Sequence, residues 1–317
     1  MKISVIIPTL NEKATIGRLI ESLNRDPYPG KEILVVDGGS TDGTLERAKE
    51  KGAIVMGEKG PKCPANARNQ GADASDSDVL CFLDGDVERV DECFITYAMR
   101  HFEQGDVVGV KCERITLTET VTGRVLEASR RLTIAGIFKR KQSSGFSYAN
   151  FIRKDVFEAT GGFPLLGYGE DRMFWRKLKK YMEENSSRRI AREPESKFYQ
   201  HRGRSLGELI REHAWYGRTT IPYIRSAKPS VWESISIVAV PAYIVSMTSI
   251  CLIPLSVWFV VLALPYLVRF FTIILEGIRQ KDGYHFMIPL IDAARSVGFV
   301  WGLLQYLAGG RSMSRGQ

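Results

Sequence analysis

Two aspartates one residue apart, Asp84 and Asp86, end the apolar run VLCFLDGD at residues 79–86. The residues before them predict a buried strand, so both carboxylates should lie where that strand stops. A buried carboxylate is costly unless it is solvated, paired or neutralised by a cation. A hard divalent cation that keeps positions open for diphosphate oxygens is the natural partner. Such pairs are also common in surface turns, so other motifs must support the assignment.

The elements that would position these acids follow from hydrophobic patterning. The apolar runs in KISVIIPTLNE (2–12) and EILVVDGGSTDGT (32–44) predict two further strands, each ending in polar and turn-forming residues. The stretch between them has apolar residues at helical spacing, which are Ile16, Leu19, Ile20 and Leu23. Alternating strands and helices over residues 1–111 predict a doubly wound α/β sheet.

Polar groups converge at one edge of this predicted sheet. In open α/β sheets, ligands bind beyond the carboxyl ends of the strands. The residues expected at those ends are Asn11, Glu12, Asp37, Gly38, Ser40, Asp84 and Asp86. Asp37 is also explained as a turn-capping acid, because Asp with Gly, Ser and Thr is ordinary turn chemistry. The arrangement therefore predicts a ligand site with capping as the alternative for Asp37.

Five motifs in order carry a family resemblance. They are IIPTLNE, VVDGGSTDGT, ARNQGA (67–72), FLDGD, and GGFP (161–164) with GEDRMFWRKL (169–178). Over residues 1 to about 225, the sequence resembles the family 2 glycosyltransferases with the GT-A fold. The resemblance implies transfer of a sugar from a nucleotide sugar, with UDP-sugars the usual donors and GDP-mannose second. It identifies neither this donor nor the acceptor.

The resemblance implies a donor site at the first strands. The positions that match its nucleotide-binding residues are Pro8, Thr9, Glu12, Asp37, Gly38, Arg68 and Asp84. Asp37 would accept a hydrogen bond from a base N–H, and Arg68 would reach the base or the diphosphate. A solvated arginine on a helix face is the alternative for Arg68.

A divalent cation, Mg²⁺ or Mn²⁺, is implied across the donor diphosphate. Asp84 and Asp86 would hold it, and it would neutralise charge on the leaving nucleoside diphosphate. His201, in FYQHRGRSL, resembles the late histidine that completes this metal site in relatives. The alternative is a surface histidine beside Arg202.

The acid pair Glu170 and Asp171 opens a predicted helix at 171–182. Acids in a first helical turn interact favourably with the helix dipole, which alone would explain them. By resemblance Asp171 is the catalytic base, which takes the proton of an acceptor hydroxyl and so implies inversion. Glu170 beside it and Trp175 one turn on would border the substrates, although Trp175 is equally explained by core packing.

Charge is unevenly distributed over the 317 residues. Lys and Arg number 44 against 36 Asp and Glu, and residues 188–228 alone hold ten basic and four acidic residues. This basic stretch precedes a hydrophobic segment, which favours anionic lipid headgroups or a phosphate-bearing acceptor as its partner. Nucleic acid is disfavoured, because no recognisable nucleic-acid module accompanies the stretch. The five cysteines have no metal-ligand spacing and indicate reduced thiols in a cytosolic setting.

The C-terminal region predicts membrane association. Residues 234–268 contain no charged residue, enough for two short spans near 235–253 and 255–275. A third apolar segment, 285–308, predicts a spanning, re-entrant or interfacial helix. We therefore expect a catalytic domain at 1–228 on the cytoplasmic face and a multi-pass membrane region at 229–317.

These observations together predict a membrane-anchored enzyme that acts on a lipid-linked saccharide or a polyprenyl phosphate. A dinucleotide-dependent oxidoreductase is disfavoured, because no GxGxxG follows the first strand. A non-catalytic membrane scaffold that kept the fold is the remaining alternative, and the intact acids at 84, 86, 170 and 171 argue against it. The sequence sets no oligomeric state.

Overall fold

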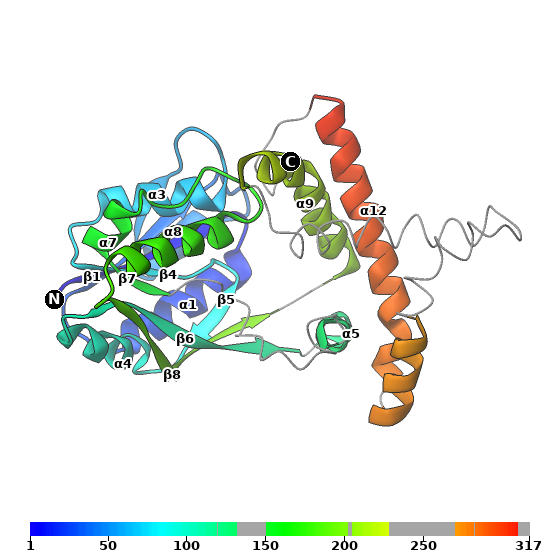
Figure 1. Cartoon of the computed structure of the whole chain (residues 1–317), viewed down its shortest axis with the longest axis horizontal. Helices are drawn as coiled ribbons and strands as arrows, with labels where there is room; N and C mark the ends of the chain where they lie inside the picture. Colours follow the sequence, from blue (N-terminus) through cyan, green and yellow to red (C-terminus); the bar gives the residue numbers. More distant parts are fainter. Residues whose placement is uncertain (119, 132–149, 202–204, 228–269, 282, 310–317) are drawn as a thin grey trace, which may run out of the picture. The chain divides into compact units, whose positions relative to one another are not determined.

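The computed structural model describes residues 1–118, 120–131, 150–201, 205–227, 270–281 and 283–309 (Figure 1). The chain divides into two compact units. The first is built from the described parts of residues 1–117 and 143–201, and the second from those of 118–142 and 202–311. The predicted boundary at residue 228 thus falls after a helix that clusters with the C-terminal part, and the assignment of functions to the two parts stays a prediction.

The first unit contains one eight-stranded sheet in the order β3-β2-β1-β4-β7-β6-β8-β5. Its strands are β1 (Ile3–Thr9), β2 (Lys31–Asp37), β3 (Ile54–Gly57), β4 (Val79–Phe82), β5 (Val87–Val90), β6 (Val107–Leu117), β7 (Phe151–Arg153) and β8 (Arg189–His201). The strands from β3 to β4 are parallel, as the doubly wound pattern predicts. Beyond β4 the sheet is mixed, because β7 pairs antiparallel with both β4 and β6.

The parallel strands place their polar ends side by side. Thr9 at the end of β1 pairs in register with Asp37 at the end of β2, and Asp37 pairs with Gly57 at the end of β3. β4 ends at Phe82, two residues before Asp84. Because all four strands run in the same direction, their carboxyl ends form one edge, and the predicted site residues meet there.

Helices cover both faces of the sheet (Figure 1). They are α1 (Lys13–Arg25), α2 (Thr44–Glu50), α3 (Pro64–Ala74), α4 (Phe94–Arg100), the 3₁₀ turn η1 (His101–Glu103), α7 (Lys154–Ala159) and α8 (Glu170–Glu184). The four apolar residues predicted to form the inner face of α1 are all fully buried. Helix α3 packs closely on β1 at Gly71, where an added Cβ would lie 2.4 Å from Ile6 Cγ2.

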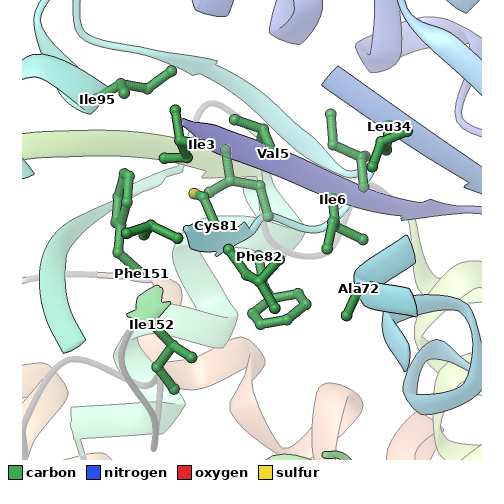
Figure 2. Packing of buried hydrophobic residues seen from close by; sticks show 14 of the residues in the cluster. Ile3, Val5, Ile6, Leu34, Ala72, Cys81, Phe82, Ile95, Phe151 and Ile152 are labelled. Carbon is green, nitrogen blue, oxygen red and sulfur yellow. The ribbon is translucent and has the colours of Figure 1, made fainter. Parts of the chain in front are cut away.

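The core of this unit is continuous from β1 through β4 to β7. Figure 2 shows Ile3, Val5 and Ile6 of β1 beside Phe82 of β4 and Phe151 of β7. On the α8 side, the Phe163 and Phe174 rings lie 4.5 Å apart between centroids. These aromatic contacts fix the start of α8 against the end of β4, which matters because both ends carry the predicted site acids.

The second unit consists of helices. They are α5 (Val121–Arg131), α9 (Leu206–Ala227), a helix at 270–280, the 3₁₀ turn η2 (Gly283–Met287) and α12 (Ile288–Leu307). Helices α9 and α12 approach very closely, since an added Cβ at Gly302 would lie 1.8 Å from the Ala214 carbonyl oxygen. On α12, Arg295 Nη1 lies 3.7 Å from Asp292 Oδ1, and it also donates to Ser129 Oγ at 3.1 Å.

One helical segment in the described part of the chain, Gly283–Leu307, is long and apolar enough to cross a membrane. Its face away from α9 carries exposed apolar side chains, which are Leu290, Val297, Trp301, Leu304 and Leu307. The predicted span at 235–253 lies outside the described residues, as does most of the span at 255–275, whose residues 270–275 are helical.

Candidate active site

The turn Asp84-Gly85-Asp86 is pressed against the end of β1. The Gly85 amide donates to the Pro8 carbonyl oxygen at 3.2 Å. An added Cβ at Gly85 would lie 3.0 Å from Thr9 Oγ1 and 3.1 Å from that same carbonyl oxygen. The close approach explains the glycine between the two aspartates, because any side chain would push the acid turn away from β1.

Arg68 joins two of the predicted acids. Its Nη2 donates to Asp84 Oδ1 at 2.6 Å, and its Nη1 donates to Glu170 Oε1 at 3.1 Å. The guanidinium lies 5.2 Å from the centre of the Phe163 ring, and the arginine is buried. The alternative of a solvated arginine is therefore wrong. One guanidinium fork ties α3 to the acid turn after β4 and to the first turn of α8.

The adjacent acids at the start of α8 have different surroundings. Glu170 is buried, and burial raises the pKa of its carboxyl from 4.5 to about 7, with Asp171 adding to the rise and Arg68 opposing it. Asp171 is half-buried, and its Oδ1 accepts the Arg172 amide at 2.7 Å. Thus Glu170 is held inside by Arg68, whereas Asp171 is partly exposed and contacts the backbone amide of the next residue.

We expect Glu170→Gln to weaken the pH dependence of stability. The pKa of Glu170 in the folded chain exceeds its unfolded value. Its contribution to the free energy of unfolding is therefore full below about pH 4.5 and is lost as the pH rises to about 7. Glutamine still accepts from Arg68 but cannot ionise. Thermal unfolding from about pH 5 to about pH 8 should therefore show a smaller fall in Tm for the variant than for the wild type. An unchanged slope, equal to that of the exposed control Glu158→Gln, would contradict this origin.

Asp86 contacts the strand that carries the predicted histidine. Gln200 Nε2 donates to Asp86 Oδ1 at 2.8 Å, and Val87 pairs in register with Gln200 on β8. His201 follows Gln200 as the last residue of β8. Its backbone is described, whereas its side chain is not. Its role as a metal ligand therefore stays a prediction.

The acid turn has donors that suit a hard cation. Asp84 accepts from Arg68 through Oδ1, and no hydrogen bond to Oδ2 occurs in the described ranges. No group of three His, Cys, Asp or Glu side chains with metal-binding geometry occurs in the part of the chain that the structure describes. Asp84 and Asp86 supply two carboxylates, so a site for Mg²⁺ or Mn²⁺ would need further ligands from His201, water or the diphosphate itself.

Hydrogen bonds within the turn after β2 hold the side chain of Asp37, one of the predicted nucleotide-binding residues. Asp37 accepts from the Gly39 and Ser40 amides, both at 2.8 Å, and from Ser40 Oγ at 2.5 Å. The capping contacts considered for Asp37 are therefore present. They hold the carboxylate in place, and its contact with a base stays a prediction. Thr9 Oγ1 is buried and has no hydrogen-bond partner among the described residues, and the role of Thr9 in nucleotide binding stays a prediction.

The remaining predicted positions lie around this edge. Glu12 precedes α1, and its Oε2 accepts from Thr15 Oγ1 at 3.1 Å. Trp175 is half-buried and packs against the core of the first unit, in line with the core-packing alternative.

Two site residues were not predicted. Glu58 directly follows β3, is buried, and accepts from the Cys63 amide at 2.9 Å. The rule that flagged Asp37, an acid after an apolar run, applies to Glu58 too, but its strand has only four residues. Gln200 lies in the polar sequence REPESKFYQH, which has no clear strand periodicity.

Comparisons with known proteins agree with this geometry. Residues 4–161 match the model of glycosyl transferase family 2. The glycosyltransferase AglE of Haloferax volcanii is 29% identical over 173 residues, which cover 51% of this chain and 56% of that protein. The GalNAc(5)-diNAcBac-PP-undecaprenol beta-1,3-glucosyltransferase of Campylobacter jejuni is 24% identical over 188 residues, 56% of this chain and 60% of that protein. The chain thus spans less than two thirds of the length of these relatives.

A solved structure supports the fold over most of the chain. A mannosyltransferase from Pyrobaculum calidifontis, in complex with GDP-Man and Mn²⁺, superposes with a TM-score of 0.56 at 15% identity, covering 96% of this chain and 87% of that one. This likeness confirms the predicted GT-A architecture. The matched family model, together with the named relatives, shows that residues 4–161 form a glycosyl transferase family 2 domain.

Proposed function

We propose that this chain transfers a sugar from a nucleotide sugar to a lipid-linked acceptor, with inversion and with the help of a divalent cation. The observation that carries the proposal is the Arg68 bridge, because it holds the acid turn of the donor side and the acid pair at the start of α8 on one guanidinium. The residues that bind the leaving group and the residue that activates the acceptor are thereby kept in fixed relation.

On the donor side, the nucleotide lies along the edge formed by β1, β2 and β4. Thr9, Asp37 and Gly38 border the base and ribose, and Asp84 and Asp86 face the diphosphate. Asp84, Asp86 and His201 would hold Mg²⁺ or Mn²⁺, which would supply positive charge to stabilise the leaving nucleoside diphosphate. UDP-sugars and GDP-sugars are the two candidate donor classes.

On the acceptor side, Asp171 acts as general base. It takes the proton of the acceptor hydroxyl while the oxygen forms a bond to the anomeric carbon from the face opposite the leaving group. The bond from that carbon to the diphosphate oxygen breaks, and its electron pair leaves with the nucleoside diphosphate. Glu170, buried against Arg68, positions this turn and does not take part in the proton transfer.

The acceptor is a lipid-linked saccharide or a polyprenyl phosphate. The Campylobacter relative is named for a lipid-linked substrate, and in this chain the basic stretch 188–228 precedes the hydrophobic C-terminal region. The exposed apolar face of α12 suits contact with lipid. Two spans near 235–253 and 255–275, with the catalytic domain cytoplasmic, complete the proposed multi-pass arrangement.

We expect the full-length chain to stay with the membrane pellet after an alkaline wash, which removes peripheral proteins. A cysteine introduced at Ser40 should react with a membrane-impermeant thiol reagent only after the cells are opened. The parent protein without the added cysteine is labelled in parallel, to measure how far the native free cysteines of the first unit react. Release by alkali, or labelling of position 40 in intact cells, would contradict the proposed topology.

The proposed donor site is tested by binding. Full-length protein in detergent should bind a nucleotide sugar in the presence of Mn²⁺ and lose most of that affinity when the metal is chelated, since diphosphate and cation bind together. Absence of binding by folded protein would favour the non-catalytic scaffold instead.

A further inference from the structure

Glu58 stands at the same sheet edge as the proposed donor site but has no part in the chemistry described above. It directly follows β3, and its amide donates to the Asp37 carbonyl oxygen at 2.8 Å. The residue is 7% exposed, so its carboxyl group is largely withdrawn from water. A buried carboxylate beside a second acid is a costly arrangement that calls for a reason.

One oxygen of this carboxylate has a structural task. Glu58 Oε1 accepts from the Cys63 amide at 2.9 Å and from Asn66 Nδ2 at 3.0 Å. Asn66 also donates to the carbonyl oxygens of Lys59 and Pro61. These contacts fold the loop between β3 and α3 and fix the orientation of the Glu58 side chain. They leave Oε2 without a hydrogen bond in the described part of the chain.

The second oxygen lies beside Gly38, at a position where this residue carries no side chain. An added Cβ at Gly38 would lie 3.4 Å from Glu58 Oε2, 3.5 Å from the Thr9 carbonyl oxygen and 3.7 Å from Leu10 Cδ1. The space next to Gly38 is therefore bounded by an acidic oxygen, a carbonyl oxygen and an apolar methyl group. Two hydrogen-bond acceptors beside an apolar wall suit the edge of a flat ring that carries N–H donors.

The electrostatics point to the same kind of ligand. Burial raises the pKa of Glu58, and the nearby Asp37 raises it further, whereas hydrogen bonds from Cys63 and Asn66 and the charge of Lys62 lower it. The charge of Asp37 therefore opposes the ionisation of Glu58. A ligand that presents hydrogen-bond donors to both carboxylates would relieve this repulsion.

We propose that Glu58 reads the base of the donor nucleotide and that, with Asp37, it selects guanine over uracil. This inference rests on the proposed function. Guanine carries an N1–H beside an exocyclic amino group, so it offers adjacent donors to two acids. Uracil has a single N–H flanked by two carbonyl oxygens, and these would face a carboxylate with like partial charge. The donor class is then a GDP-sugar rather than a UDP-sugar.

The test is equilibrium binding of GDP and UDP to the full-length protein with Mn²⁺. We expect GDP to bind about 10- to 100-fold more tightly than UDP, the size of one hydrogen bond to a charged group. Glu58→Gln keeps an acceptor for Cys63 but turns N–H groups toward the ligand. It should lower the GDP affinity about tenfold and leave the UDP affinity within about twofold. The matched control is Glu50→Gln, an exposed acid on α2.

The outcomes separate this inference from the proposed function. Equal or tighter binding of UDP by the wild type, or an equal loss for both nucleotides in Glu58→Gln, would overturn base selection while leaving donor binding intact. Absence of binding for both nucleotides in the wild type would overturn the proposed function itself. If Glu58→Gln fails to fold, Gly38→Ala replaces it, since its methyl group meets neighbours only at ordinary contact distances. That variant should weaken the binding of GDP more than the binding of UDP, and an equal loss for both nucleotides would count against the inference.

Discussion

Replacing Asp86 with alanine is expected to abolish sugar transfer and to leave the chain folded. Asp86 follows the acid-turn glycine, and its carboxylate is held by Gln200 at 2.8 Å. Removing it deletes a ligand of the cation that stabilises the leaving diphosphate. Since that assistance is worth several kcal/mol, turnover should fall at least about a thousandfold. Asp84→Ala should also impair transfer severely, because Arg68 then loses one of its two acids.

Steady-state rates of the purified variants, measured over a range of Mn²⁺ concentrations, would check this expectation. The matched control is Asp76→Ala, which removes a surface acid that pairs with the exposed Lys2. Unfolding curves establish that each variant is folded. Near-normal turnover of Asp86→Ala, or full wild-type activity in excess chelator, would rule out the proposed metal role.

The second large effect is expected for Asp171→Asn, which should lower kcat by about two to four orders of magnitude, the usual size of a general-base contribution. Asparagine can still accept the Arg172 amide, so the start of α8 should be preserved. Donor affinity should change little, because the proposed mechanism places Asp171 on the acceptor side. Rate and donor binding are therefore measured separately.

The chain offers a close control for this experiment. Asp155 also lies in the first turn of a helix, and its Oδ1 accepts the Val156 amide at 2.8 Å. Asp155→Asn changes the same local contact far from the proposed site and should leave kcat unchanged. A loss for Asp171→Asn that appears only as weaker donor binding would show that its role is misassigned. A barely altered kcat would favour a phosphate acceptor, which is already ionised and needs no base.

Much of the first unit was predictable, because the pattern of apolar and polar residues indicates which segments are buried and where each strand ends. β1, β2 and β4 are apolar runs that end in polar residues, and α1 shows a clear helical period. Since parallel strands share an edge, their end residues could be brought together without coordinates.

What the sequence left open depends on contacts between distant segments. Arg68 lies more than a hundred residues before Glu170, and no local pattern shows that one guanidinium joins the two. β8 is a long strand of mostly polar sequence, whose pairing with β5 and β6 sets the place of Gln200. Glu58 was missed because its strand is short and partly exposed. Such positions become visible only when the sheet order is known.

The donor base is where the structure goes beyond the resemblance. The family resemblance makes a UDP-sugar the first expectation. We infer guanine instead from the carboxylates of Asp37 and Glu58 near Gly38. Base selection and catalysis are independent in this account. The acid turn and Asp171 would serve either donor class.

The central claim is that this chain moves a sugar to a membrane lipid in a metal-dependent reaction. The most direct measurement incubates full-length protein with radiolabelled nucleotide sugars and a lipid extract, and follows label into the lipid phase. We predict that label from one nucleotide sugar enters the lipid phase with Mn²⁺ present, that chelation stops it, and that Asp86→Ala protein transfers none. Two results would contradict the account: folded, membrane-bound protein that transfers no label from any nucleotide sugar, or transfer that continues equally well after chelation.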